Sequence, residues 1–310
     1  MTHRGGVYRA PLPGALAAFQ SIAALRHACP HAHNAIACAN GAGCQRIRVD
    51  SMAEAFSQSM IEVNGCRTSV RRGGVGRTLL YLHGASGAPG IAPFMSDLAR
   101  DFDVVVPEHP GFGDSDEPAW LDNIHDMAFF YLDFLERLDL SDVILVGTSI
   151  GGWLALEIAV RSTARIAAIS VVGPSGLYVP GLSRGDIFLW SPEERVRKLF
   201  VDQSIADRML AQVLTPDQNE AMIKNQYTVA KLAWEPRLFD PHLYKWLHRI
   251  DVPTQILWGE SDKVIPVGYA AEFARLIPQA RVDIIAACGH LPPVEQPAEF
   301  CRLLRAFVAG

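Results

Sequence analysis

The sequence predicts an α/β protein built on one mostly parallel sheet with helices on both faces, together with a helical insertion. Short apolar runs alternate with helix-like segments from about residue 60 to residue 172, and strand-like runs return at 254–258 and 282–285. This alternation requires a parallel sheet that is covered on both faces. The chain has 310 residues, of which 49% are hydrophobic, so one domain can bury a large core.

A hairpin is expected first, followed by alternating strands and helices. Asn64-Gly65 separates the strand-like runs 61–63 and 68–71 and is typical of a hairpin turn. Asp122 is expected to cap a later helix, because apolar residues recur after it at spacings of three and four up to Leu138. In chain order we expect strand 79–81, helix 92–100, strand 104–106, helix 124–138, strand 143–146, helix 153–160 and strand 166–172.

The strand pattern stops between about residues 174 and 247. Helix starts are expected at Ser191 and at Thr215, each of which is followed by proline and acidic residues. The segment is rich in aromatic and methionine side chains, most of which we expect to pack within it or against the core. Its arginines lie in charge-mixed stretches for which a solvated face is expected. These are Arg184, Arg195, Arg197, Arg208 and Arg237.

The pentapeptide Gly147-Thr148-Ser149-Ile150-Gly151 lies between a predicted strand and a predicted helix. A strand that turns into a helix within so few residues forces the middle residue into a strained conformation, and small residues two places to either side avoid a clash. The Ser149 hydroxyl is then held clear of the backbone at the end of the sheet. Ile150 begins the helix, so its amide is free to point at a developing oxyanion. The pattern predicts a nucleophilic serine.

An acid and a histidine follow the last two predicted strands. Asp262 lies in the first of these turns, with Glu260 as a competing acid, and His290 lies in the second. The loops that follow the strands of a parallel sheet converge on one crevice. We therefore expect a triad in which Ser149 attacks an acyl carbon, His290 takes its proton, and Asp262 holds His290 in the required tautomer.

In the chain order serine, acid, histidine, the protein resembles the α/β-hydrolase family. The resemblance covers roughly residues 55–310. It extends to Leu82-His83-Gly84-Ala85-Ser86-Gly87, which is similar to the oxyanion loop of the family, and to His109-Pro110-Gly111-Phe112-Gly113-Asp114-Ser115, which is similar to its glycine-rich loop. By this resemblance, residues 174–247 form a helical cap that overhangs the serine.

The resemblance also implies the members of an oxyanion hole. The backbone amide of Ala85, with that of Ser86 as the neighbouring alternative, joins the amide of Ile150. The residues themselves agree with this, because a glycine-rich strand exit exposes amides that no ladder can satisfy. The family uses the amides of this loop rather than its histidine ring, so His83 is expected to be structural.

Several activities remain open for a serine nucleophile on this scaffold. Haloalkane dehalogenases and epoxide hydrolases of this fold use a carboxylate nucleophile and are excluded. The first expectation is an esterase that cleaves a small, largely apolar acyl ester through an acyl-enzyme. The second is a hydrolase of carbon–carbon bonds in ring-cleavage dicarbonyl products, although such enzymes typically place an aromatic residue where this chain has Leu291. A small-ligand receptor on the same scaffold is the alternative from another class, and turnover under excess ligand separates it from the enzymes.

Composition limits the partners. The net charge of −5, with 20% charged residues, predicts neither a nucleic-acid nor a membrane partner. We expect a small-molecule substrate and a cytoplasmic location, while a homodimer stays open. No metal or organic cofactor is implied.

Residues 1–54 are expected to be a low-order extension, so that the catalytic domain occupies residues 55–310. The first 49 residues contain five arginines and no acidic residue, and they lack a regular hydrophobic period. They also hold Cys29, His31, His33, Cys38 and Cys44, whose spacings fit no common zinc-binding pattern.

Overall fold

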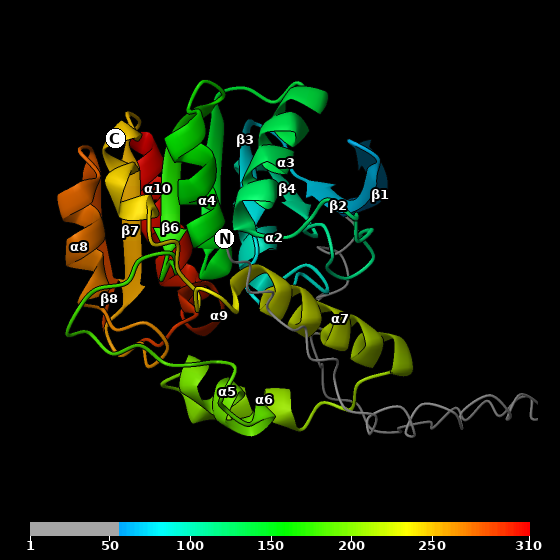
Figure 1. The fold of residues 1–310 in the computed structure, drawn as a ribbon, viewed down its shortest axis with the longest axis vertical. Coiled ribbons are helices and arrows are strands. Elements are labelled where there is room, and N and C mark those ends of the chain that lie inside the picture. The colour runs from blue at the N-terminus through cyan, green and yellow to red at the C-terminus, as the bar shows by residue number, and fades with distance from the viewer. Residues whose placement is uncertain (1–55) are drawn as a thin grey trace, which may run out of the picture. The chain divides into compact units, whose positions relative to one another are not determined.

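The computed structural model describes residues 56–310, and their centre is an eight-stranded sheet (Figure 1). Its strands are β1 (Phe56–Val63), β2 (Cys66–Gly73), β3 (Arg77–Leu82), β4 (Phe102–Pro107), β5 (Val143–Thr148), β6 (Ile166–Val172), β7 (Thr254–Gly259) and β8 (Ala280–Ile285). They are ordered β1-β2-β4-β3-β5-β6-β7-β8. β2 pairs antiparallel with β1 and β4, and all other neighbours are parallel. The predicted mostly parallel sheet is confirmed.

Helices cover both faces of this sheet. They are α2 (Pro93–Leu98), α3 (Ile124–Arg137), α4 (Ile150–Arg161), α8 (Tyr269–Leu276), α9 (Pro292–Glu295) and α10 (Pro297–Ala309). Side chains of α3, α4 and α8 form one buried cluster, and those of α2 and α10 form a second. β5 contributes Leu145 to the first cluster and Ile144 to the second, because successive side chains of a strand point to opposite faces. The two clusters therefore make the sheet the middle layer of the core.

The first hairpin turn is as predicted, whereas the ends of α2 and α3 differ slightly from the prediction. Asn64 and Gly65 have φ values of 51° and 73° and form the expected two-residue turn between β1 and β2. The α3 helix is capped by Asn123, not by Asp122. The Asn123 side chain accepts hydrogen bonds from His125 N and Asp126 N, whereas the Asp122 amide donates to the Asp126 carboxylate. The helix expected at 92–100 is shorter than predicted, since α2 ends at Leu98.

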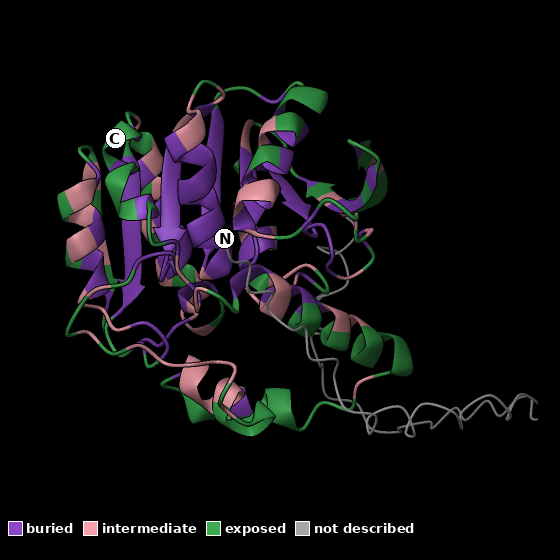
Figure 2. Cartoon of the chain, viewed as in Figure 1, coloured by how far each residue is buried: buried purple, intermediate pink, exposed green. Residues whose placement is uncertain are grey.

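The insertion, defined here as residues 173–253, separates β6 from β7. It contains α5 (Pro192–Leu199), α6 (Gln203–Leu210), α7 (Pro216–Ala233) and two short 3-10 helices, η1 (Leu243–Lys245) and η2 (Leu247–Arg249). Helices begin after Ser191 and Thr215, as predicted, and both residues are N-caps with capping boxes. Figure 2 shows α6 and the outer part of α7 largely exposed and α5 partly exposed, whereas the inner strands of the sheet are buried. The insertion is thus joined to the core through a limited set of contacts.

Residues 1–54, with the candidate zinc ligands among them, lie outside the described residues. Within residues 56–310, Cys66, Cys288 and Cys301 are buried and unpaired. None of the helices in this part of the chain has both the length and the hydropathy needed to span a membrane.

Candidate active site

Ser149 lies in the sharp turn that joins β5 to α4. Its φ and ψ are 57° and −115°, a conformation that side-chain-bearing residues rarely adopt. Both flanking glycines are required by close packing. A Cβ at Gly151 would lie 2.1 Å from the Leu82 carbonyl oxygen, and a Cβ at Gly147 would lie 2.2 Å from the Gly151 carbonyl oxygen. The expected strained serine between two obligatory glycines is therefore present.

The structure brings the three predicted triad residues together. His290 Nε2 lies 2.9 Å from Ser149 Oγ, and His290 Nδ1 lies 2.7 Å from Asp262 Oδ2. The side chains of His290 and Asp262 are 3% and 0% exposed, so the ion pair that forms when His290 takes a proton is shielded from water. Ser149 keeps partial exposure. These contacts allow proton transfer from Ser149 to His290.

The acid beside His290 is Asp262, and Glu260 lies elsewhere. The second oxygen of Asp262, Oδ1, accepts hydrogen bonds from Val264 N at 2.7 Å and Ile265 N at 2.9 Å. These bonds fix the orientation of the carboxylate. The Glu260 carboxylate instead accepts a hydrogen bond from Ala287 N at 3.2 Å.

The oxyanion loop forms a tight turn against the serine. Gly87 N donates to the Gly84 carbonyl oxygen at 3.1 Å, which places Ala85 and Ser86 at the two central positions of the turn. A Cβ at Gly84 would lie 3.5 Å from Ser149 Cβ, so the turn packs directly on the elbow. Ile150 is the first residue of α4, where amides have no carbonyl partner one turn back. That Ala85 and Ile150 donate to an oxyanion stays a prediction.

The His83 ring is hydrogen-bonded to the backbone of this loop and of the loop after β4. Its Nδ1 lies 2.8 Å from the Gly84 carbonyl oxygen, and its Nε2 accepts a hydrogen bond from His109 N at 3.0 Å. Burial lowers the pKa of His83 to about 4, so the ring is neutral at physiological pH. The His109 ring continues the network to the Tyr131 hydroxyl at 2.5 Å. The contacts agree with a structural role for His83.

Arg184 of the insertion lines the same pocket as Ser149. Ile150, Ser175, Leu238 and four further residues complete the lining. The Arg184 guanidinium donates to the carbonyl oxygens of Leu238 at 2.9 Å and Leu177 at 3.3 Å. Burial lowers the pKa of Arg184, as expected for a cation that has lost water without gaining an anion. The expectation of a solvated face is wrong for Arg184, because the residue lies in a loop folded inward and not on an exposed helix.

Two polar residues that connect the insertion to catalytic loops were not predicted. Asn225 of α7 is 7% exposed and donates to the Ser86 carbonyl oxygen. Glu295 of α9 accepts hydrogen bonds from Gly289 N at 2.6 Å and, through its other oxygen, from Val201 N and Asp202 N. Asn225 falls on the stripe of α7 that also buries Thr228, Val229, Leu232 and Ala233. A polar side chain on an apolar helical stripe is a signal that could have singled it out.

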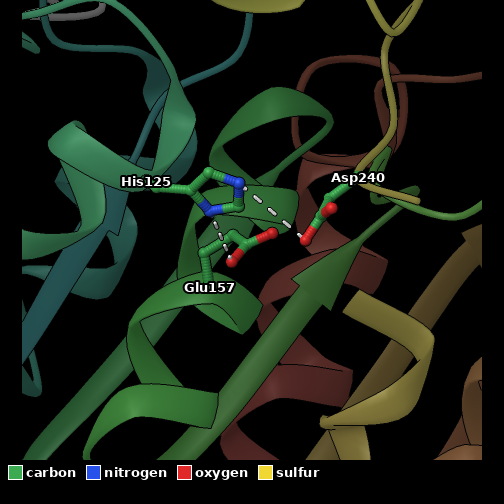
Figure 3. Close-up of side chains that lie close together, drawn as sticks. All are labelled: His125, Glu157 and Asp240. Carbon is green, nitrogen blue, oxygen red and sulfur yellow. Dashed lines mark ion pairs between the residues drawn. The ribbon is translucent and has the colours of Figure 1, made fainter. Parts of the chain in front are cut away.

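A second cluster of titratable groups joins α3, α4 and the insertion (Figure 3). His125 Nδ1 lies 3.4 Å from Glu157 Oε2, and His125 Nε2 lies 4.0 Å from Asp240 Oδ2. Their ligand-type atoms lie within 4.8 Å of one another, close enough to hold a metal ion. However, Arg161 donates to Glu157 at 2.6 Å and contacts His125 Nδ1 at 2.8 Å, while Trp153 Nε1 donates to the second Glu157 oxygen. A metal would have to displace the Arg161 cation, so the cluster is better described as an ion-pair network.

An α/β sheet with a serine elbow and a serine–histidine–aspartate contact defines a hydrolase-type protein. Residues 79–303 match the model of the alpha/beta hydrolase family. The chain therefore belongs to the α/β-hydrolase family and is an enzyme of the α/β-hydrolase type.

Known proteins that resemble this chain include hydrolases of ring-cleavage products. The chain is 25% identical to the 2-hydroxymuconate semialdehyde hydrolase of Pseudomonas sp. (strain CF600), over 79% of this chain and 91% of that protein. It is 27% identical to the 2-hydroxy-6-oxo-2,4-heptadienoate hydrolase of Pseudomonas putida, over 81% and 96% respectively. The crystal structure of a membrane phospholipase A, a bacterial virulence factor, is similar with a TM-score of 0.69 and 24% identity, over 84% of this chain and 87% of that one. This last likeness concerns the fold alone.

Proposed function

We propose that the protein hydrolyses a carbon–carbon bond in a small dicarbonyl acid of the ring-cleavage type. One observation carries this choice over the esterase. Arg184 lines the pocket of Ser149, and none of the carboxylates in residues 56–310 pairs with it, because the nearby Asp186 pairs with Arg237. A partly buried cation without an anion favours a substrate that carries a carboxylate. The two similar hydrolases, whose names denote a semialdehyde and an oxo acid, support the same class of reaction.

Ser149, His290 and Asp262 would perform the chemistry as a triad. His290 Nε2, 2.9 Å from Ser149 Oγ, takes the hydroxyl proton while Oγ attacks the ketone carbon. The amides of Ala85 and Ile150 stabilise the resulting oxyanion. When the tetrahedral intermediate collapses, the carbon–carbon bond breaks. Its electron pair passes to the carbon conjugated with the second carbonyl group, and that carbon receives the proton from His290.

Water then completes the reaction. His290 takes a proton from a water molecule, whose oxygen attacks the acyl carbon on Ser149, and returns the proton to Ser149 Oγ as the acid product leaves. Asp262 stabilises the charged form of His290 in both halves of the cycle. The chain's own residues thus account for each proton transfer.

The insertion serves as a cap over the pocket in this proposal. Arg184, Gly185, Ile187 and Leu238 come from the insertion and line the pocket together with Ser149. Substrate enclosure of this kind keeps water away from the carboxylate and strengthens its pairing with Arg184. Leu291 follows His290 where ring-cleavage hydrolases typically have an aromatic residue. We therefore expect a preference for a different acyl group, not a different reaction.

A substrate panel tests the proposed reaction. Purified protein is assayed with p-nitrophenyl esters of several chain lengths, lactones and a vinylogous 1,5-diketone acid. The expected result is a kcat/KM for the diketone acid at least about tenfold above that of every ester, which corresponds to about 1.4 kcal/mol of preferential transition-state binding. If kcat/KM is higher for an ester than for the diketone acid, the protein is better interpreted as an esterase. Stoichiometric binding without turnover of any compound would favour the receptor.

The substitution Arg184→Ala is expected to raise KM for the diketone acid about 10- to 100-fold. A hydrogen bond to a charged group contributes about 1.5–3 kcal/mol, and this contact would be lost equally in the ground and transition states. Steady-state kinetics measure the change. Arg208→Ala is the control, because Arg208 is an exposed residue of α6 whose guanidinium contacts Ser204. An unchanged KM in Arg184→Ala would contradict a carboxylate-binding role.

A further inference from the structure

Asn225 occupies a buried junction between α7 and two loops of the core. Its Nδ2 donates to the Ser86 carbonyl oxygen at 3.1 Å, and its Oδ1 accepts from Gly113 N at 2.9 Å. Both ends of the amide are used, and the side chain is inside the protein. The contacts span 139 and 112 positions of sequence. Asn225 therefore joins the insertion to the loops that follow β3 and β4.

The partner in the first loop belongs to the turn that carries the expected oxyanion donor. Ser86 directly follows Ala85 in the turn from Gly84 to Gly87. A Cβ at Gly87 would lie only 2.5 Å from Asn225 Nδ2, so the Asn225 amide packs on this turn as well as bonding to it. The other end of the turn packs on Ser149 through Gly84. The turn is thus held between the elbow on one side and Asn225 on the other.

The chemistry of the junction requires an amide. Gly113 N can only donate a hydrogen bond and the Ser86 carbonyl can only accept one, so a bridging side chain must offer one acceptor and one donor. Aspartate offers two acceptors and leucine offers neither. Only asparagine has this pair of groups at this length, which also fixes the orientation of its amide.

We propose that Asn225 is a positioning residue for the oxyanion loop. The inference rests on the proposed function to the extent that Ala85 N stabilises an oxyanion on the Ser149 adduct, whichever bond is cleaved. Oxyanion donors act only when they lie about 2.7–3.1 Å from the place where the charge develops. Without Asn225 the turn loses its support on the side away from Ser149, and the Ala85 amide leaves that position.

The same helix supplies a matched control. Thr228, one turn further along α7, is 0% exposed, and its Oγ1 donates to the Gly111 carbonyl oxygen at 2.6 Å. Thr228→Val removes this bond with little change of shape. It therefore weakens the attachment of α7 to the core as Asn225→Leu does, but it leaves the contact with the oxyanion turn intact.

The test compares Asn225→Leu, Asn225→Asp and Thr228→Val with wild type in the full chain. Three readouts are measured: the rate at which a fluorophosphonate labels Ser149, kcat and KM for the best substrate of the panel, and Tm. We expect both Asn225 variants to lose about 10- to 100-fold in labelling rate and kcat, with KM within about twofold. Thr228→Val is expected to lower Tm by a few degrees, as Asn225→Leu does, and to keep both rates within about twofold.

The outcomes separate this inference from the proposed function. If wild type is labelled and Asn225→Leu is labelled equally fast, Asn225 has no positioning role, while the triad stands. If Thr228→Val loses rate in parallel with the Asn225 variants, the effect comes from general loosening of α7 and the inference fails. If wild type itself is not labelled, the triad is at fault. Asn225→Asp, which is nearly identical in size, decides the question if Asn225→Leu does not fold.

Discussion

Ser149→Ala is expected to reduce kcat by about 10⁶-fold and to abolish labelling by a fluorophosphonate, with the fold unchanged. Loss of the nucleophile in a serine triad has an effect of this order, because the histidine and the acid act only through it. Ser149 Oγ is the atom in contact with His290 Nε2, and alanine at the elbow keeps the strained backbone position. Turnover, labelling and Tm together measure the result.

Ser59→Ala provides the control for Ser149→Ala. Ser59 is an exposed residue of β1, and an ordinary surface serine is not nucleophilic at neutral pH. The Ser59 variant should be labelled and should turn over substrate like wild type. Labelling at the wild-type rate in Ser149→Ala would show that the nucleophile is another residue.

Asp262→Asn is expected to lower kcat by about 10⁴-fold. Val264 N and Ile265 N donate to Asp262 Oδ1, so asparagine at this position would keep its oxygen there and turn its NH₂ group toward His290. His290 Nδ1 would then have to accept a hydrogen bond and carry its proton on Nε2, facing Ser149. In that tautomer His290 cannot take the serine proton.

Glu260→Gln is the matched control for Asp262→Asn. Glu260 lies two residues earlier in the same turn, and its carboxylate contacts Ala287 N rather than His290. The Glu260 variant is expected to keep kcat within about twofold. If it is more damaged than Asp262→Asn, the acid of the triad has been misassigned.

Local patterns predicted the parts of the molecule that depend on neighbours in sequence. The alternating apolar runs gave the parallel sheet, because a strand buried on both faces needs a continuous apolar stretch. The order of strand, Gly147-Thr148-Ser149-Ile150-Gly151 and helix predicted the elbow, since its strain depends on backbone geometry within five residues. Ser191 and Thr215 were predicted as helix starts because an N-cap also depends only on residues within three positions of it.

Features that depend on contacts between distant segments were misjudged or missed. The sequence around Arg184 does not mark the residue as buried, and its place in the pocket depends on carbonyl groups of Leu177 and of Leu238, 54 positions away. The hydrogen bonds by which Asn225 and Glu295 join the insertion to the core are made with backbone groups more than 90 positions distant. Hydrophobic periodicity contains no information about such partners. The proposed preference for carbon–carbon over ester bond cleavage rests on the place of Arg184 in the pocket, which hydrophobic periodicity could not predict.

The hydrogen bonds at residues 199–202 determine which part of the insertion can be exchanged with that of another family member without disturbing His290. His290 N donates to the Leu199 carbonyl oxygen at 2.8 Å, and Glu295 binds Val201 N, Asp202 N and Gly289 N. Replacing the whole insertion would change the residues whose backbone groups bond to His290 and Glu295, as well as the residues that line the pocket. By contrast, the hydrogen bonds of α6 and the loop after it stay within the insertion. Exchanging residues 203–215 alone would leave the histidine's backbone bonds intact, so this stretch is the natural unit for grafting.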